Sequence, residues 1–151
     1  MATTFNLFDI WRKTVADPTR SAAVTGTLKM SLHVAGTINQ NTMDFWNDVT
    51  AAAAEVTGTG YTARGNALSS PGWTGPDGSG ICTFDASDPA QWAQDASGFT
   101  NARIAIIYYD TASDTTSTLV GYSADFGADV SNVSGTVDVA LNASGIYTSP
   151  R

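Results

Sequence analysis

The sequence predicts a mainly β fold: a single-domain β-sandwich or open barrel with a short N-terminal helix and one further short helical segment. Three observations favour this class, namely several short segments of alternating apolar residues, turns rich in glycine, and little sequence with a helical period. A chain of 151 residues is long enough to bury one core. We expect an N-terminal arm at 1–26 and a β-domain at 27–151.

The arm is predicted to contain a helix over residues 5–15. Phe8, Trp11 and Val15 fall on one helical stripe, and Phe5 adds another large aromatic side chain at its start. Two interpretations stay open for this stripe. It docks on the core of the domain itself, or it docks on a partner protein.

The β-domain begins with its clearest strand. In "LKMSLHV" (28–34) apolar residues alternate with Lys29, Ser31 and His33, which predicts a half-buried strand with a polar outer face. A short helical segment is expected within 42–58. The further strands are expected in "GYTARGNAL" (60–68), "GICTFDA" (80–86), "ARIAIIYYD" (102–110), "TLVGYSADFG" (118–127) and "GTVDVALN" (135–142), with a turn cluster at 69–80.

Composition excludes several classes of function. The formal net charge is −7, and the Lys and Arg residues are dispersed along the sequence rather than clustered. We therefore do not expect the chain to bind nucleic acid. No apolar run approaches the roughly 20 residues of a membrane span, and no basic leader or signal peptide is recognised, so we expect a soluble protein made in the cytoplasm. Cys82 is the only cysteine and is expected to be a buried strand thiol.

Three glycines in "EVTGTGYTARGNAL" (55–68) have almost the spacing of a phosphate-binding loop. Such a loop needs a helix at its end and, for ATP-type sites, a lysine followed by Ser or Thr, and neither follows here. We therefore expect Gly58 and Gly60 to supply special backbone angles and to let Tyr61 approach the sheet closely.

No other catalytic or metal-binding pattern stands out. The sole histidine, His33, has no neighbouring Ser or Cys in a nucleophile context, so it is expected to face solvent or to make contacts. Asp85 and Asp88 lie in sequence typical of turns, where an aspartate side chain bonds to nearby backbone amides. We favour this interpretation over the two alternatives, calcium binding and glycoside hydrolysis. Trp73 lies in the turn cluster, where an exposed ring could stack on a sugar or bind a protein.

The chain as a whole resembles a family of small virion structural proteins of tailed bacteriophages. The resemblance rests on "FWNDV" at 45–49, "EVTGTGYTARGNAL" at 55–68, "FDASDPAQW" at 84–92, "IIYYDT" at 106–111, "LVGYSADFGAD" at 119–129 and "GTVDVALNASGI" at 135–146. These segments occur in the family's order over about residues 28–147. The stretch 89–103 is longer than the usual connection, and the first 26 residues match only loosely.

The resemblance implies a non-enzymatic component of the particle without catalytic residues, cofactor or metal. Among such components we favour a capsid decoration or cement protein on the capsid exterior, bound to the major capsid protein as a homo-oligomer, with a trimer favoured. A tail, neck or fibre component and a carbohydrate-binding module are the alternatives. The expected interface residues are Phe5, Phe8, Trp11, Val15 and Trp73, and deletion of residues 1–15 is expected to weaken attachment to heads while the β-domain stays folded.

Overall fold

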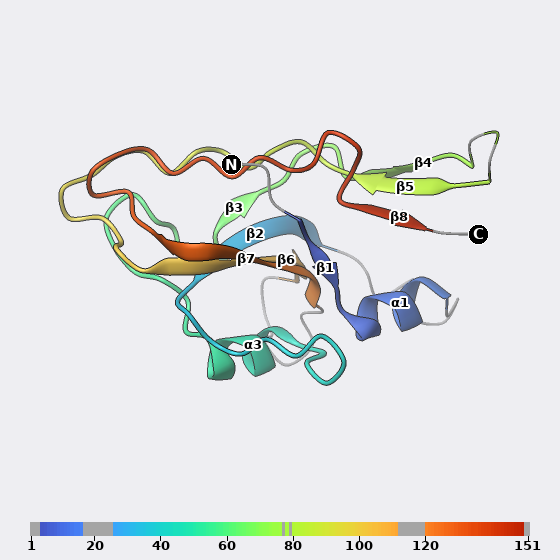
Figure 1. Cartoon of the computed structure of the whole chain (residues 1–151), viewed down its shortest axis with the longest axis horizontal. Coiled ribbons are helices and arrows are strands. Elements are labelled where there is room, and N and C mark those ends of the chain that lie inside the picture. Colours follow the sequence, from blue (N-terminus) through green and yellow to red (C-terminus); the bar gives the residue numbers. More distant parts are fainter. Residues whose placement is uncertain (1–3, 17–25, 77, 79, 112–119, 150–151) are drawn as a thin grey trace.

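Two antiparallel sheets and two short helices make up the computed structural model, which describes residues 4–16, 26–76, 78, 80–111 and 120–149 (Figure 1). One sheet has five strands in the order β1-β7-β6-β2-β3, and the other has three in the order β4-β5-β8. The mainly β class is confirmed, with open sheets rather than a closed barrel. The elements are β1 (Asn6–Leu7), α1 (Asp9–Ala16), β2 (Thr27–His33), α3 (Trp46–Ala52), β3 (Asn66–Ala67), β4 (Gly72–Thr74), β5 (Cys82–Asp85), β6 (Ala102–Asp110), β7 (Val120–Val130) and β8 (Tyr147–Ser149).

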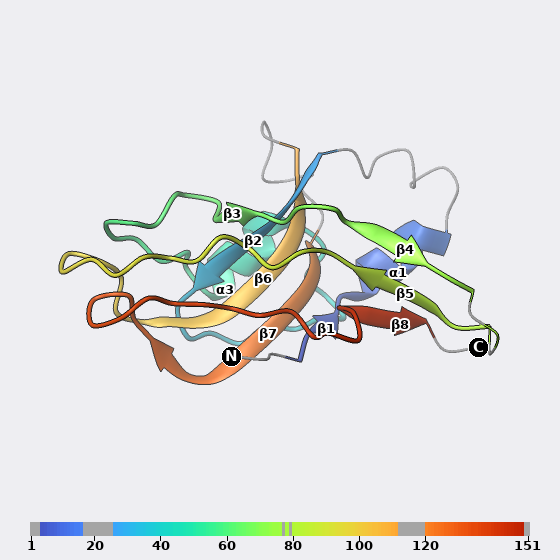
Figure 2. The same cartoon turned by 90° about the horizontal axis from the view of Figure 1, so that it is seen from above.

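The five-stranded sheet forms the middle layer of the molecule. Helix α3 covers one of its faces, and the three-stranded sheet lies beyond the other face together with long extended segments (Figures 1 and 2). Each face therefore has its own core. Residues of the core between the two sheets include Leu28, Met30, Leu32, Phe84, Trp92, Ile107 and Tyr122, and those of the core beneath α3 include Phe8, Trp46, Val49, Ile106 and Tyr108.

Strand β2 lies where the sequence predicts it, but it is not half-buried. It pairs with the central strand β6 along its whole length, from Thr27 opposite Asp110 to His33 opposite Ile104. Ser31 and His33 are fully buried, although the alternating pattern predicted that their side of the strand faces solvent. The reason is the second layer, because α3 and the chain around it cover the face that carries these polar side chains.

Helix α1 is shorter than the predicted helix, and α3 lies within the segment where a short helix is predicted. Residues 6–7 form β1 on the edge of the five-stranded sheet, so α1 begins at Asp9 rather than at residue 5. Helix α3 begins at Trp46, where the carboxylate of Asp48 accepts hydrogen bonds from the backbone N–H groups of Asp44 and Phe45 at 3.1 and 3.0 Å. Asp48 thus satisfies backbone donors beside the helix start.

Two predicted strand segments and the predicted turn cluster differ from the structure. In 60–68 only Asn66–Ala67 is strand, and residues 135–142 form no strand in the described part of the chain, only isolated bridge positions at Val137, opposite Trp92, and at Ala140. Val137, Val139 and Leu141 are nevertheless buried in alternation, so this segment packs as extended chain. Val137 exchanges backbone hydrogen bonds with Trp92 and Leu141 N–H donates to Asp88 Oδ1, but the described residues form no continuous ladder here. The predicted turn cluster in turn contains β4, which carries Trp73.

Candidate functional site

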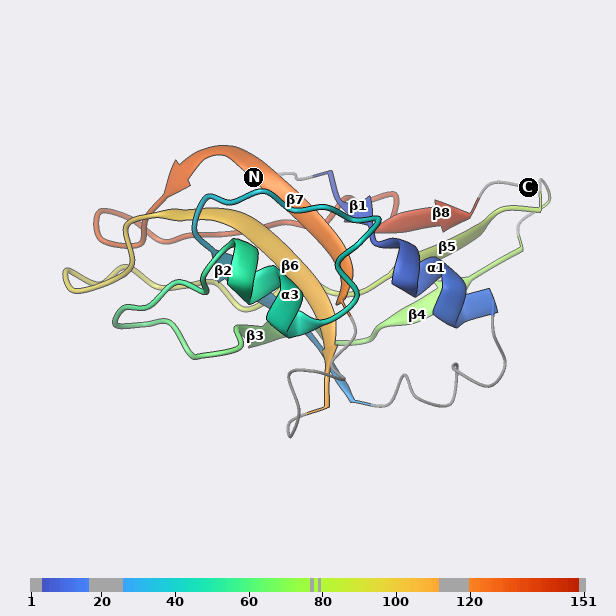
Figure 3. The same ribbon diagram turned by 90° about the horizontal axis from the view of Figure 1, so that it is seen from below.

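Phe8 and Trp11, two of the expected interface residues, belong to the core of the chain. Their exposed fractions are 0% and 3%. The Trp11 ring stacks on Tyr109 of β6 with centroids 5.1 Å apart, and it meets Phe84 of β5 at 6.2 Å and Tyr122 of β7 at 6.1 Å. Helix α1 therefore lies beneath the three-stranded sheet and joins it to the five-stranded one (Figures 1 and 3). Of the two interpretations left open for this stripe, the structure favours docking on the chain's own core.

The other three expected interface residues have different environments. Phe5 is partly buried against the core between the sheets. The side chain of Val15 lies outside the described residues. Trp73 is 44% exposed, and with Ile81 it is one of the exposed large apolar side chains among the described residues. Its predicted exposure is confirmed, but it stands on the edge strand β4 rather than in a turn.

Trp73 is the exposed end of a row of aromatic rings. It lies opposite Phe84 on β5, which lies opposite Tyr147 on β8, so the three side chains share one face of the small sheet. The ring centroids of Trp73 and Phe84 are 5.4 Å apart, and Tyr147 meets Trp73 edge-on at 6.2 Å. Ile81 differs from Phe84 by an odd number of residues, so it belongs to the opposite face. The two exposed apolar side chains do not form one patch.

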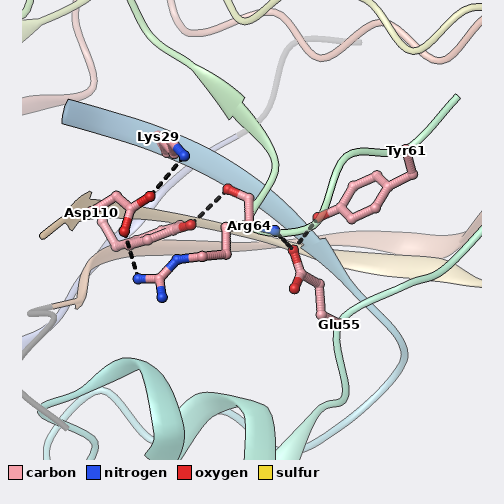
Figure 4. Close-up of polar contacts among 6 residues, drawn as sticks. Lys29, Glu55, Tyr61, Arg64 and Asp110 are labelled. Atoms are coloured by element: carbon pink, nitrogen blue, oxygen red, sulfur yellow. Dashed lines mark hydrogen bonds and ion pairs between the residues drawn. The ribbon is translucent and has the colours of Figure 1, made fainter. Parts of the chain in front are cut away.

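The glycine-containing motif at 55–68 folds onto the five-stranded sheet through Glu55 and Tyr61 (Figure 4). The carboxylate of Glu55 accepts hydrogen bonds from the Tyr61 hydroxyl at 2.7 Å and from the backbone N–H of Arg64 at 2.5 Å. The Tyr61 hydroxyl oxygen in turn accepts from the backbone N–H of Leu32 in β2 at 2.9 Å. Burial raises the pKa of Glu55, and the hydrogen bond from Tyr61 and the nearby Arg64 charge oppose this effect.

Arg64 and Lys29 share one buried carboxylate, that of Asp110. Arg64 Nη2 and Lys29 Nζ lie 2.6 and 2.7 Å from its two oxygens, and the side chain of Asp110 is only 5% exposed (Figure 4). The Tyr108 hydroxyl donates to the backbone carbonyl of Arg64 at 2.6 Å, and burial raises its pKa. The Arg64 guanidinium carbon lies 5.5 Å from the ring centroid of Trp46. Removing one member of such a pair leaves an uncompensated buried charge, so this network fixes where the motif sits on the sheet.

Gly58 and Gly60 have the special backbone angles that the sequence predicts, with φ of +158° and +80°. Gly65, which the sequence analysis did not single out, has a similar role. Gly65 has a φ of +69°, and a Cβ atom there would lie 1.9 Å from the carbonyl oxygen of Met30. A Cβ atom on Gly58 would lie 2.5 Å from the backbone nitrogen of Phe99. The absence of side chains at these glycines lets the motif pack directly against the backbone of Met30 and Phe99. Tyr61 contacts β2, as expected, through its bond with Leu32.

Asn132 connects three segments that the sequence analysis did not associate. It is fully buried, and its side-chain nitrogen donates to the carbonyl oxygens of Thr59 and Ala93 at 3.2 and 2.9 Å. Its side-chain oxygen accepts from the backbone N–H of Phe99 at 2.8 Å. In "VSNVSG" an asparagine looks like an ordinary turn residue, so no signal in the sequence identified this role.

His33 has a serine neighbour after all. Its Nε2 lies 2.9 Å from Ser31 Oγ, and its Nδ1 lies 2.8 Å from the carbonyl oxygen of Ala53. Because a carbonyl only accepts, Nδ1 carries the proton and Nε2 accepts from the serine hydroxyl. Burial lowers the pKa of His33 to about 4, and the hydrogen bond to Ala53 opposes this effect. Both side chains are fully buried, so this Ser–His pair contributes to packing and offers no accessible nucleophile.

The carboxylates that had been compared with calcium or glycosidase sites bond to backbone amides. Asp85 Oδ1 accepts from the N–H of Ala86 at 2.9 Å, and Asp88 Oδ1 accepts from the N–H of Leu141 at 2.7 Å. Among the described residues no three His, Cys, Asp or Glu side chains gather as metal ligands. Cys82, expected to be buried, is only partly so.

A small hollow of about 120 Å³ is lined by residues of β1, β6 and β7 and of the chain segment 36–40. Asn6, Gln40, Ser123 and Asp125 supply its polar lining, and Gln40 Nε2 donates to Ser123 Oγ at 2.9 Å. A space of this size holds a few water molecules. None of the helices in the described part of the chain is both long and apolar enough to cross a membrane.

The fold and its polar clusters define a small, mainly β domain with open sheets, in which a glycine-containing motif is fixed to the central strands by a buried ion-pair network. Comparison of the chain with protein-family models, with curated proteins and with solved structures found no match.

Proposed function

We propose that the chain is a non-enzymatic structural protein of a tailed-bacteriophage virion, and that it decorates and cements the outside of the capsid. The observation that carries this proposal is the arrangement of the motif at 55–68, the longest segment of the resemblance to small virion proteins. Glu55, Tyr61 and Arg64 bond within the chain and hold the motif on β2 and β6. The polar groups of this motif thus contribute to a rigid scaffold, which suits a protein whose task is to bind and stabilise.

Trp73 is the contact point that we assign to the capsid. It is exposed on an edge strand, and the surrounding residues 69–76 carry no formal charge in a chain with a net charge of −7. Phe84 and Tyr147 hold its ring in place, so little side-chain freedom is lost when a partner covers it. Rigid, partly exposed tryptophans are frequent among the residues that dominate binding energy at protein interfaces.

Cementing follows from binding to the assembled shell. A protein that binds only the assembled form stabilises it by mass action, by about 2.7 kcal/mol per site when its free concentration is 100 times its Kd. Partners that bridge neighbouring capsid subunits add this free energy at every site. The major capsid protein is therefore the proposed partner.

The deciding experiment is to separate heads from tails of the particle and to ask which subassembly retains the chain. We expect it on heads, and we expect Trp73→Ala to reduce binding of the purified protein to empty heads at least tenfold. Ile81→Ala is the matched control, since Ile81 is also an exposed large apolar residue but belongs to the other face, and it should bind as the unaltered chain does. Retention on tails alone would replace the capsid assignment by a tail, neck or fibre role.

The exposure of Trp73 also favours one function of another class, carbohydrate binding. A ring at the edge of a β-sheet can stack on a sugar, as it can on a protein side chain. A glycan array separates the two functions. A sugar signal that Trp73→Ala abolishes, together with no retention on heads or tails, would favour a carbohydrate-binding module over a virion protein.

A further inference from the structure

The N-terminal arm, here defined as residues 4–16 with β1 and α1, pairs with β7 and not with β2, the strand that follows it in the chain. Its described backbone bonds are made with β7 and with the chain before α3. Asn6 and Leu7 pair with Ser123 and Tyr122, Phe8 N–H donates to the Gly121 carbonyl at 3.0 Å, and Asp9 N–H donates to the Gln40 carbonyl at 2.9 Å.

The site that receives the arm is an apolar groove between the two sheets. Trp11 fills it against Tyr109, Tyr122 and Phe84, which come from three different strands. The indole ring also lies beside Gly121 of β7, where an added Cβ atom would be 3.8 Å from two of its carbons. The structure thus shows directly which segment this groove accepts.

Few backbone bonds hold the arm in its groove. Strand β1 has two residues and lies at the edge of its sheet, with β7 as its neighbour. Opening the arm breaks this short ladder and exposes the buried side chains of Phe8, Ile10 and Trp11. The same side chains are covered again when the arm enters another copy, so the cost of opening is recovered on exchange. The connection to β2, "DPTRSAAVTG" at 17–26, contains no aromatic residue, and ten residues span up to about 33 Å when extended.

We propose that the arm is exchanged between copies, so that residues 4–16 of one chain fill the groove beside β7 of the next. The contacts within the groove are the same in the closed monomer and in the exchanged assembly, which makes such exchange a low-cost route to oligomers. Donation from each copy to the next is a heterologous contact, and it closes a ring when the rotation allows. A high local concentration on a particle favours the exchanged form. This inference goes beyond the proposed function and is tested on purified protein alone.

The test uses two variants of the full chain, both carrying Cys82→Ser. One has Asn6→Cys and the other has Ser123→Cys, because these residues lie directly opposite each other in β1 and β7. Opposite residues in antiparallel strands have Cα atoms about 4.5–5.5 Å apart, within the range of a disulfide. The variants are mixed, unfolded, refolded together and oxidised. We expect a disulfide between the two chains whose yield rises with protein concentration.

The matched control replaces Asn6→Cys by Ile106→Cys. Ile106 lies opposite the same Ser123 on the other side of β7, but it belongs to the body of the domain and is not exchanged. We expect the arm variant to give several-fold more cross-linked dimer than this control. Equal yields would overturn the proposal, because they would reflect random collision.

A single chain carrying both Asn6→Cys and Ser123→Cys shows whether the substitutions are tolerated. Closure of its disulfide within one chain at every concentration, with no cross-link between mixed chains, would also overturn the proposal. As a second measurement, sedimentation of the unaltered chain refolded at high concentration is expected to show oligomers that return slowly to monomer after dilution. Monomer alone at every concentration would contradict arm exchange.

Discussion

Among the glycines whose surroundings the structure describes, Gly65 is the one where an added Cβ atom would come closest to another atom. With a φ of +69° and the Met30 carbonyl oxygen 1.9 Å from a hypothetical Cβ, Gly65→Ala combines backbone strain with displacement of β2. We expect this change to lower the free energy of unfolding by at least about 2 kcal/mol. Urea unfolding followed by circular dichroism measures it.

Gly127 supplies the comparison for this prediction. Its φ of +79° is similar, but no heavy atom lies within 4 Å of a Cβ built there. Gly127→Ala should therefore show the backbone cost alone, about 1 kcal/mol. Equal losses for the two variants would mean that the close approach to Met30 is not what requires glycine at position 65.

His33 makes the stability of the fold depend on pH. Its pKa is about 4 in the folded chain, below the ordinary value of 6.5, so between these values the unfolded chain binds the proton and the folded chain does not. The free energy of unfolding should therefore fall as the pH decreases from 6.5 through 4, by up to about 3 kcal/mol. Glu55 acts in the opposite direction, since its raised pKa favours the folded state at low pH.

The contribution of His33 is isolated by His33→Gln, which keeps a hydrogen-bonding side chain but does not titrate. Whatever its effect at neutral pH, this variant should lose less stability than the unaltered chain between pH 7 and pH 4. Urea unfolding at several pH values provides the comparison. The same slope in both proteins would assign the acid sensitivity to another group.

At the scale of elements, α1 is a structural part of the domain. Trp11→Ala removes a ring that contacts three strands, and we expect a loss of about 3–5 kcal/mol in the free energy of unfolding. Deletion of residues 1–15 removes Phe8 and Ile10 as well, so the earlier expectation of an intact β-domain after this deletion gives way to one of a destabilised domain. Thermal unfolding of both variants measures these effects.

Arg12→Ala provides the control on the same helix. The Arg12 side chain is 66% exposed, and its ion pair with Asp9 spans 3.8 Å. Exposed pairs of this kind contribute about 0–1 kcal/mol, so this variant should remain close to the unaltered chain. A Trp11→Ala variant as stable as Arg12→Ala would show that α1 is dispensable for folding.

The elements that the sequence predicted well are those whose own residues determine them. Strands β2, β5, β6 and β7 carry alternating or continuous apolar residues and lie within or close to the predicted segments. The segment 135–142 has the same alternation, and its residues Val137 and Leu141 are buried. It is not a strand, because a strand also requires a neighbour hydrogen-bonded along its length, and which segments become neighbours is decided by the whole fold.

The same reasoning applies to the candidate site. The backbone role of Gly58 and Gly60 and the exposure of Trp73 could be predicted, because the local sequence around each of them is typical of turns. Contacts between distant positions could not. The ion pair of Arg64 with Asp110 and the bonds of Asn132 depend on segments that lie far apart in the chain. The burial of His33 depends on α3, which covers that face of the sheet.

For the molecule as a whole, the distribution of charge leads us to expect an uncharged contact with heads rather than a charge-driven one. The basic side chains that the structure describes, Arg12, Lys29, Arg64 and Arg103, all pair with carboxylates of the same chain. An uncharged contact through Trp73 should therefore depend little on ionic strength. We expect the affinity for heads to change less than threefold between about 0.05 and 0.5 M salt, whereas a charge-driven contact would weaken steeply.

The position of Trp73 also gives the chain a built-in optical reporter. Trp11, Trp46 and Trp92 are at most 4% exposed, while Trp73 is 44% exposed, so a water-soluble quencher reaches one indole and leaves the fluorescence of the others largely unchanged. Association through β4 would shield that indole and shift its emission to the blue without any attached dye. Binding kinetics can then be followed in the unaltered protein, and Trp73→Phe supplies the blank.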